Sequence, residues 1–360
     1  MKQIASFLFI TAVLQLTAQD NTPKYSNEFL NIGIDARAFG LGLSMSSHVD
    51  DVSSLYWNPA GLNDMKADHQ LEMMHAAYFA GIANYDFVGY ARKLDDQSSV
   101  GISALRFSVD DIADTRFLFD ATGAINYNNI QFFSASDYAL FISYARVLPI
   151  LGGLKTGGSV KVLHRMVGKF ATSWGFGMDL STQKTFGKWM VGLMAKDVFG
   201  TFNAWSHNTD EVSQVYTLTG NAIPENTLEI TLPRLIAGVS RKVQLSNAFS
   251  VLATADFVWT FDGKRNTLVR TNFGSLDPMG GIEIGYKNLA FLRGGVNQFQ
   301  QIEDFDGSQS WSFQPNAGIG IKFREVAIDY ALTDIGDQSA GLYSNVFSIK
   351  VDFNAKEDDE

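Results

Sequence analysis

A group of side chains near the start of the chain has the residue types of a metal site. His69, Glu72 and His75 are spaced three residues apart, and imidazole and carboxylate groups are common metal ligands. Successive side chains of a β-strand point to opposite faces, so His69 and His75 would share a face that Glu72 does not. We therefore interpret the three as ordinary strand residues and predict no bound metal.

Two adjacent carboxylates, Asp50 and Asp51, could form a catalytic acid–base pair. The alternative is a structural role, because Asp50 is suited to cap a short helix that runs to about Trp57. Pro59 would then stop this helix, and Gly61 would permit a left-handed turn after it. We favour capping over catalysis.

An acidic run at residues 303–307 has some features of a calcium loop but lacks the full spacing and the terminal Glu. We interpret it as a solvated turn. The chain also contains no Gly-x-x-x-x-Gly-Lys, His-Glu-x-x-His or Gly-x-Ser-x-Gly motif. We predict that the protein is not an enzyme and uses no cofactor.

The composition excludes several further classes of protein. The 360 residues include no Cys, which rules out disulfides, thiolate metal sites and a thiol nucleophile. A formal charge of −10 argues against nucleic acid as a partner, since phosphate contacts need clustered Lys and Arg. Only 18% of residues are charged while 13% are aromatic, and there are 32 Gly, a balance that favours strands.

The N-terminus has the features of a secretory signal peptide. An apolar run at residues 4–16 follows Lys2, and small Ala18 precedes the expected cleavage point, so we assign residues 1–18 to the signal. The rest of the sequence contains no apolar run of the 18 or so residues that a membrane helix needs. This leaves a soluble exported protein or a β-barrel.

From His69 to Phe353 the chain alternates between apolar and polar residues with a period of two. In the last segment, for example, Phe347 and Ile349 alternate with Ser348 and Lys350. Such segments of about ten residues are typical of transmembrane barrel strands. Fourteen predicted strands are centred near Met73, Val88, Ser103, Phe141, Val162, Gly177, Leu193, Leu235, Ala253, Ile284, Leu292, Ile319, Ile328 and Ile349.

When the connections between these segments are numbered from the first segment, the even-numbered and odd-numbered ones differ in length. The even ones are all short, whereas the odd ones include long segments, with two short exceptions near Gly81 and Gly168. The long ones are residues 110–134, 200–225, 262–279, 298–314 and 334–344. Short turns at one end and long loops at the other are how outer-membrane barrels are built. We predict a 14-stranded antiparallel transmembrane β-barrel that contacts outer-membrane lipid.

The predicted barrel occupies residues 67–353 and is flanked by two other segments. Residues 27–62 do not alternate, and a barrel of this width must be plugged or form a pore, so we assign residues 19–66 to an N-terminal hatch or plug. Residues 354–360 form an acidic C-terminal tail.

Two motifs in the hatch resemble the opening of the PorV/PorQ family of Bacteroidetes outer-membrane barrels, whose fold is related to the FadL transporters. They are Gly-x-Asp-Ala-Arg-Ala-x-Gly and, after an Asp-rich stretch, Tyr-Trp-Asn-Pro-Ala-Gly-Leu. The motif residues are Asp35, Arg37, Gly40, Asp50, Asp51, Trp57, Asn58, Pro59, Ala60 and Gly61. Unlike that family's barrels, which end close to the last strand aromatic, this chain continues past Phe353.

The resemblance, closest to the PorV-like branch, implies a non-enzymatic component of the type IX secretion system in the bacterial outer membrane. Its partners would be translocon or attachment-complex proteins and the C-terminal signal domains of secreted cargo. The predicted loops offer aromatic residues for such contacts. These are Phe117, Phe119, Phe132, Phe133, Phe202, Trp205, Phe305 and Trp311.

Other interpretations of these features stay open. The aromatic residues could instead belong to strand extensions or fold over the barrel mouth. The protein could be a FadL-like transporter of hydrophobic small molecules, with Asn58, Pro59 and Ala60 in a gating hatch. It could also be a purely structural barrel that supports a larger complex.

Overall fold

The computed structural model describes residues 25–119, 122–303, 306–333 and 344–354. The predicted signal peptide, Phe305 and residues 355–360 of the predicted tail lie outside these ranges. Within these ranges four short helices precede the first strand: η2 Glu28–Asn31, α2 Ala36–Gly40, α3 Ser54–Trp57 and η3 Pro59–Asp64, where η marks a 3-10 helix. The others are η4 Phe79–Gly81, η5 Tyr127–Asn129 and α4 Thr209–Thr219. None of the helices in the described ranges is long and apolar enough to cross a membrane.

The first half of the sheet contains β1 His69–Tyr78, β2 Ala83–Lys93, β3 Ser98–Asp114, β4 Gln131–Leu148, β5 Leu154–Val167, β6 Ala171–Phe186, β7 Trp189–Lys196 and β8 Thr201–His207. The second half contains β9 Thr227–Thr231, β10 Arg234–Gln244, β11 Phe249–Thr260, β12 Val269–Arg270, β13 Ser275–Tyr286, β14 Ala290–Glu303, β15 Gln309–Phe323, β16 Val326–Thr333 and β17 Ser344–Phe353.

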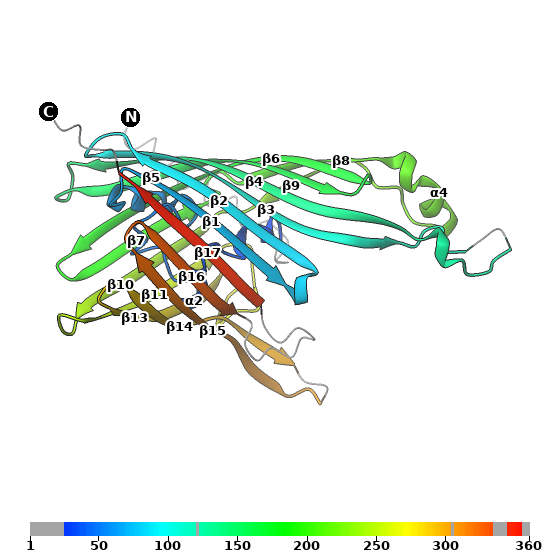
Figure 1. The fold of residues 1–360 in the computed structure, drawn as a ribbon. Coiled ribbons are helices and arrows are strands. Elements are labelled where there is room, and N and C mark those ends of the chain that lie inside the picture. Colours follow the sequence, from blue (N-terminus) through cyan, green and yellow to red (C-terminus); the bar gives the residue numbers. More distant parts are fainter. Residues whose placement is uncertain (1–24, 120–121, 304–305, 334–343, 355–360) are drawn as a thin grey trace.

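These strands form one closed antiparallel barrel (Figure 1). The sheet closes where β17 pairs with β1, which places Phe353 opposite His69. β7 and β8 both pair with β6 and together form one interrupted wall strand. β10 pairs with β7 and β9 pairs with β8, so β9 and β10 together form the next interrupted wall strand. β12 pairs through two residues with β13 alone. The wall therefore has fourteen strands, which confirms the predicted fold class.

All fourteen predicted strand centres fall inside strands, and the connections divide by length as expected except that only five residues separate β14 from β15. The short ones, such as those after Lys93, Phe186 and Phe323, lie together at what we call the turn end, on the left of Figure 1. The long ones lie at the opposite loop end. Period-two alternation locates barrel strands well because one face of every strand meets lipid.

The predicted long loops were too long. β3 continues to Asp114 and β4 begins at Gln131, so the first loop is shortened from both sides. The segment predicted as a loop from residue 200 contains β8 and α4, and β14 and β15 extend the hairpin around residue 306. Pairing between neighbouring strands continues beyond the part of the wall that alternation identifies, because backbone hydrogen bonds do not require an apolar face.

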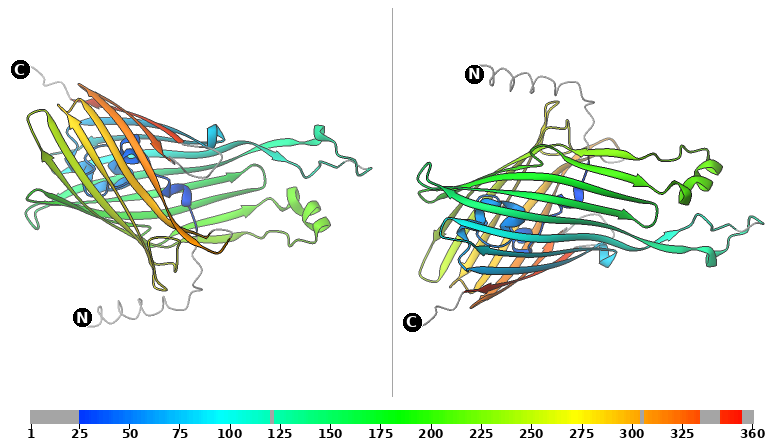
Figure 2. Two further views of the ribbon diagram at one scale, coloured as in Figure 1. Left: turned by 90° about the horizontal axis from the view of Figure 1, so that it is seen from below. Right: turned by 90° about the horizontal axis from the view of Figure 1, so that it is seen from above.

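The segment before the barrel lies inside it, where Figure 2 shows its short helices surrounded by strands. Glycines on the inner wall allow its backbone to touch the strands. A Cβ on Gly295 would lie 2.1 Å from the Gly42 nitrogen, and one on Gly192 would lie 2.0 Å from the Ser46 carbonyl oxygen. Any side chain at these wall positions would push the inner segment away.

The predicted helix cap in this segment was wrong. Helix α3 begins at Ser54 with Ser53 at its N-cap, and Asp51, not Asp50, accepts a hydrogen bond from the Ser53 backbone at 3.0 Å. Gly61 was also misread, because it does not have a left-handed backbone. A Cβ there would lie 2.3 Å from the Val49 carbonyl oxygen, so this glycine is needed for close packing.

Candidate functional site

The Asn-Pro-Ala-Gly motif holds the inner segment together and anchors it to the wall. The Asn58 amide donates to the Ser46 carbonyl at 2.7 Å and to the Thr182 carbonyl of β6 at 3.2 Å. Its side-chain oxygen accepts from the Ala60 backbone. A Cβ on Gly157 of β5 would lie 2.4 Å from the Ala60 nitrogen. The motif therefore positions a buried turn against β5 and β6.

The other hatch motif positions charged groups in a buried ion-pair network. Lys350 of β17 contacts Asp35 at 2.7 Å and Asp51 at 2.6 Å, and the Asp35 side chain is fully buried. Asp35 also accepts a hydrogen bond from Ser348, at 3.0 Å. Two predicted hatch residues that are distant in sequence thus meet at one lysine. Because breaking a buried ion pair leaves an uncompensated charge, the network ties the inner segment to β17.

A second branch of the network runs from Arg37 across β13 to β16. Arg37 contacts Glu283 at 3.0 Å and Asp50 at 3.7 Å. Arg293 then bridges Glu283 at 2.7 Å and Asp329 at 2.6 Å. The motif residues Asp35, Arg37, Asp50 and Asp51 are therefore ion-pair partners of the barrel interior rather than an isolated carboxylate pair.

Burial and neighbouring charges shift the pKa of these groups. Burial alone would lower the pKa of Arg37, but Glu283 and Asp50 outweigh it and raise that pKa above its usual value. Burial raises the pKa of Asp51, but Lys350 and Arg37 reverse this and hold it well below the usual range. Burial, reinforced by Arg37, lowers the pKa of His48 to about 3. His48 is therefore neutral at ordinary pH.

On the loop-end side of the inner segment lies a cavity of about 300 Å³, the loop-end cavity. Its apolar lining includes Leu43, Trp57, Ile236, Val258 and Met279. Its charged lining is Glu28, Lys196, Arg234, Asp256, Arg265 and Asp277. The cavity therefore has a patch of apolar side chains beside a larger set of charged and amide side chains.

The charged groups of the loop-end cavity are not all neutralised. Glu28 bridges Arg234 at 2.7 Å and Arg265 at 3.3 Å. Lys196 instead lies over the Tyr56 ring, with its nitrogen 4.2 Å from the ring centroid. Among described residues, Oδ1 of Asp256 has no hydrogen-bond partner. A bound molecule could therefore find a cation and a buried acceptor here.

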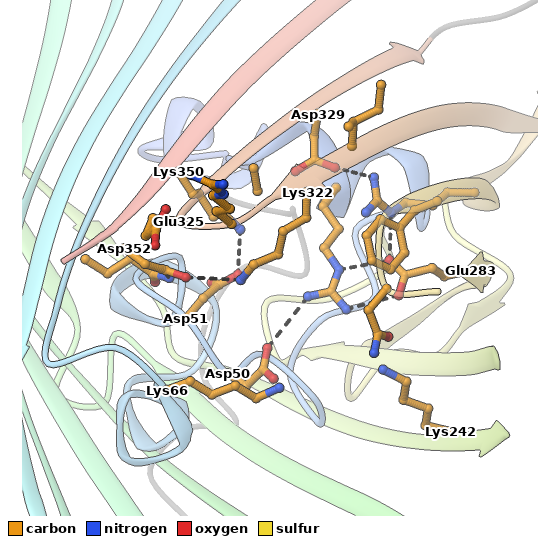
Figure 3. Close-up of a pocket in the computed structure, with 18 residues that line it drawn as sticks. Asp50, Asp51, Lys66, Lys242, Glu283, Lys322, Glu325, Asp329, Lys350 and Asp352 are labelled. Atoms are coloured by element: carbon orange, nitrogen blue, oxygen red, sulfur yellow. Dashed lines mark hydrogen bonds and ion pairs between the residues drawn. The ribbon is translucent and has the colours of Figure 1, made fainter. Parts of the chain in front are cut away.

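On the other side of the inner segment lies a basin of about 380 Å³, the turn-end basin (Figure 3). Its lining includes Arg37, Asp50 and Asp51 of the inner segment together with Glu283, Asp329 and Lys350 of the wall. Helix α2 packs against β14 to β17, and Leu41 and Gly42 after it lie against β13 and β14, so this part of the inner segment lies between the two chambers. Figure 3 shows the network side chains converging on this basin.

The proposed partner-binding aromatic residues do not form one site. Phe117 lies in a turn and Phe119 in an isolated bridge, while Phe132 and Phe133 belong to β4. Phe202 and Trp205 belong to β8 and Trp311 to β15, so the prediction that these five lie in loops was wrong. Strand extension was the alternative that the sequence left open. Phe119, Phe132, Phe202 and Trp311 are all exposed.

The His69-Glu72-His75 group is divided between the two faces of β1. Glu72 is fully buried inside the barrel, whereas His75 is exposed and contacts Asp86 at 2.7 Å. Nowhere in the described ranges do three His, Asp or Glu side chains gather in a way that could hold a metal ion.

Sequence reasoning missed the wall residues that line both chambers. These are Lys196, Arg234, Asp256, Asp277, Glu283, Arg293, Asp329 and Lys350. A signal was present, because a charged residue within an alternating strand must point away from lipid. The alternation could not show which of these inward charges meet, since that depends on how strands distant in sequence are arranged.

Comparison with solved structures gives the same architecture. The CymD monoaromatic hydrocarbon channel matches with a TM-score of 0.55 and 13% identity, over 90% of this chain and 98% of that chain. The barrel has a FadL-like fold. The Pseudomonas putida toluene transporter TodX matches with a TM-score of 0.54 and 15% identity, over 90% and 99% of the two chains. For a Pseudomonas aeruginosa FadL homologue the values are 0.52 and 11%, over 89% and 98%.

At these identities the likeness extends to the fold alone. No protein-family model matches the sequence, and no curated protein sequence matches it.

Proposed function

We propose that this protein is a bacterial outer-membrane barrel that binds a hydrophobic small molecule in the loop-end cavity and takes part in its uptake. The observation that carries the proposal is the cavity itself, with apolar side chains of the wall and the inner segment facing one another inside a FadL-like barrel. Three barrels of this fold are named as hydrocarbon channels or toluene transporters.

The size of the cavity suits a small aromatic or short aliphatic molecule. An engineered apolar cavity of about 150 Å³ binds benzene, and this one has about 300 Å³. Trp57 and Tyr56 line one side, where an aromatic ligand could pack against their rings. In this proposal the inner segment acts as the predicted hatch, because it lies between the cavity and the turn end.

Filling the cavity tests the proposal. In Val258→Trp the new indole occupies the space between the wall and the inner segment, so binding of toluene to the liposome-reconstituted barrel should fall at least about tenfold, or about 1.4 kcal/mol. Val251→Trp is the matched control, because Val251 lies on the same strand and faces outward. Equal toluene binding by the two folded variants would contradict the proposal.

The type IX secretion hypothesis stays a prediction, favoured by a different observation. Strands β6, β8 and β9 pair beyond the part of the wall that β10 and β11 form, and they expose Phe202, Leu228 and Ile230. Exposed apolar groups of this kind often contact protein partners. Replacing residues 208–226, which include α4, with a short Gly/Ser linker should then abolish co-purification of secreted proteins. Partners retained by the folded variant would contradict it.

A further inference from the structure

The turn-end basin carries positive charge that the buried network does not use. Lys66, Lys242 and Arg324 line it, and all three side chains are exposed. None of the three forms an ion pair with any residue that the structure describes. Lys66 and Lys242 lie on opposite sides of the basin in Figure 3.

The remaining charges of the basin are largely compensated. Its other cations are Arg37, Arg293, Lys322 and Lys350, and each has a carboxylate partner in the network or in Asp352. Among described residues, Glu325 is the one basin carboxylate without an ion-pair partner. The three unpaired cations therefore outnumber the one unpaired carboxylate, and the lining as a whole has seven cations and six carboxylates.

The last strand ends at this rim. Asp352 lines the basin and contacts Lys322 at 3.1 Å, and its backbone nitrogen donates to the Glu325 carbonyl. The Asn354 side chain accepts from the Asp68 backbone at 3.3 Å, two residues from Lys66. The chain thus leaves the wall between two of the three unpaired cations.

The residues that follow Asn354 carry mainly negative charge, opposite to that of the three unpaired cations. Residues 355–360 read Ala-Lys-Glu-Asp-Asp-Glu, with four consecutive carboxylates at residues 357–360. Six residues span at most about 20 Å, which is enough to cross a basin of this size from its rim. No other run of four consecutive acidic residues occurs in the chain.

We propose that the turn-end basin binds the acidic run 357–360 of its own chain through Lys66, Lys242 and Arg324. The tether gives the run a high effective concentration, which offsets the weakness of individual exposed ion pairs. Screening by salt must weaken the contact, because these charges are exposed to solvent. The basin would then be a binding site for acidic peptide, whatever the loop-end cavity binds.

The absence of Cys allows a direct test with two spin labels on the full barrel in lipid. One label is placed at Asn288→Cys, which lines the basin, and the other at Glu360→Cys, which leaves three carboxylates in the run. At low salt we expect a narrow short-distance peak, and at about 1 M salt, where the Debye length is about 3 Å, a broad distribution. A label pair at Asn288→Cys and Ser246→Cys, both in turns, should not respond to salt.

Charge variants decide the outcome. The triple variant Lys66→Gln, Lys242→Gln, Arg324→Gln should lose at least half of the short-distance peak at low salt. The control Lys93→Gln, Arg146→Gln, Lys188→Gln removes the same charge from turn-end positions outside the basin and should keep it. Displacement of the peak by a free Glu-Asp-Asp-Glu peptide would support the site. A peak that survives the basin variant, or that never forms, would overturn the proposal.

Discussion

The loop-end cavity and the turn-end basin are two chambers of one barrel, and the same inner segment forms a wall of each. Towards the loop end it presents Leu43, Tyr56 and Trp57, and towards the turn end Arg37 and the adjacent aspartates. The cavity combines a patch of apolar side chains with six charged ones, while the basin is lined mainly by ion pairs. A short segment of the chain can therefore create two unlike environments, because its successive turns face opposite ends of the barrel.

The difference also separates binding from anchoring. The apolar side chains around the cavity leave space that a ligand can occupy. The ion pairs beside the basin instead join the inner segment directly to the wall. We therefore expect substitutions on the two sides to affect different measurements.

The largest effect should come from removing the close contact that separates the chambers. Gly295→Leu places a side chain where the Gly42 backbone lies, so we expect about 3 kcal/mol or more of destabilisation, or displacement of the inner segment. Limited proteolysis and heat-induced unfolding in detergent would measure this. Gly294→Leu is the matched control, since nothing lies within 4 Å of a Cβ at that adjacent position. Equal stability of the two variants would show that the segment does not depend on this contact.

A loss of similar size, without a backbone clash that displaces the inner segment, should follow from breaking the network beside the basin. Lys350→Met leaves the buried carboxylates of Asp35 and Asp51 without their cation, which should cost about 3–5 kcal/mol. Lys322→Met, which breaks an exposed pair with Asp352, should cost at most about 1 kcal/mol. Denaturant unfolding of both variants would compare them. Toluene binding by the folded fraction of either variant should be unchanged, and a loss of binding would contradict the separation of the chambers.

The smallest of the three effects is a pH dependence from His48. Its pKa of about 3 in the folded protein lies below the value of about 6.5 expected when unfolded, so protons bind preferentially to the unfolded chain. His48 therefore lowers stability as pH falls from about 6.5 towards 3, by about 1.4 kcal/mol for each unit. Between pH 6.5 and 5, His48→Gln should lose about 2 kcal/mol less stability than the unsubstituted protein. Parallel pH profiles would exclude this role.

The sequence predicted the wall of the barrel more completely than its contents. Phe347 and Ile349 alternate with Ser348 and Lys350 because lipid and interior impose opposite preferences on neighbouring residues. The same rule located one centre in each of the fourteen wall strands. It failed at β8 and at the ends of β3 and β4, where hydrogen bonding between strands continues without that alternation.

The candidate site was less predictable than the wall. The hatch motifs identified Asp35, Arg37 and Asn58 as residues of interest, but not their partners Lys350, Glu283 and the Thr182 carbonyl. Those partners are 124 to 315 positions away in sequence. The pattern of residues within one segment cannot show which residues more than a hundred positions away it will contact.

A closed fourteen-strand barrel with short turns at one end is thus predictable from the amino-acid sequence, because strand alternation and turn length are local properties. What the barrel encloses is set by contacts between distant parts of the chain. Where Gly42 meets Gly295 and where Lys350 meets Asp35 and Asp51 depend on the curvature of the wall and on the path of the inner segment within it. Those contacts set the boundary between the apolar cavity and the charged basin.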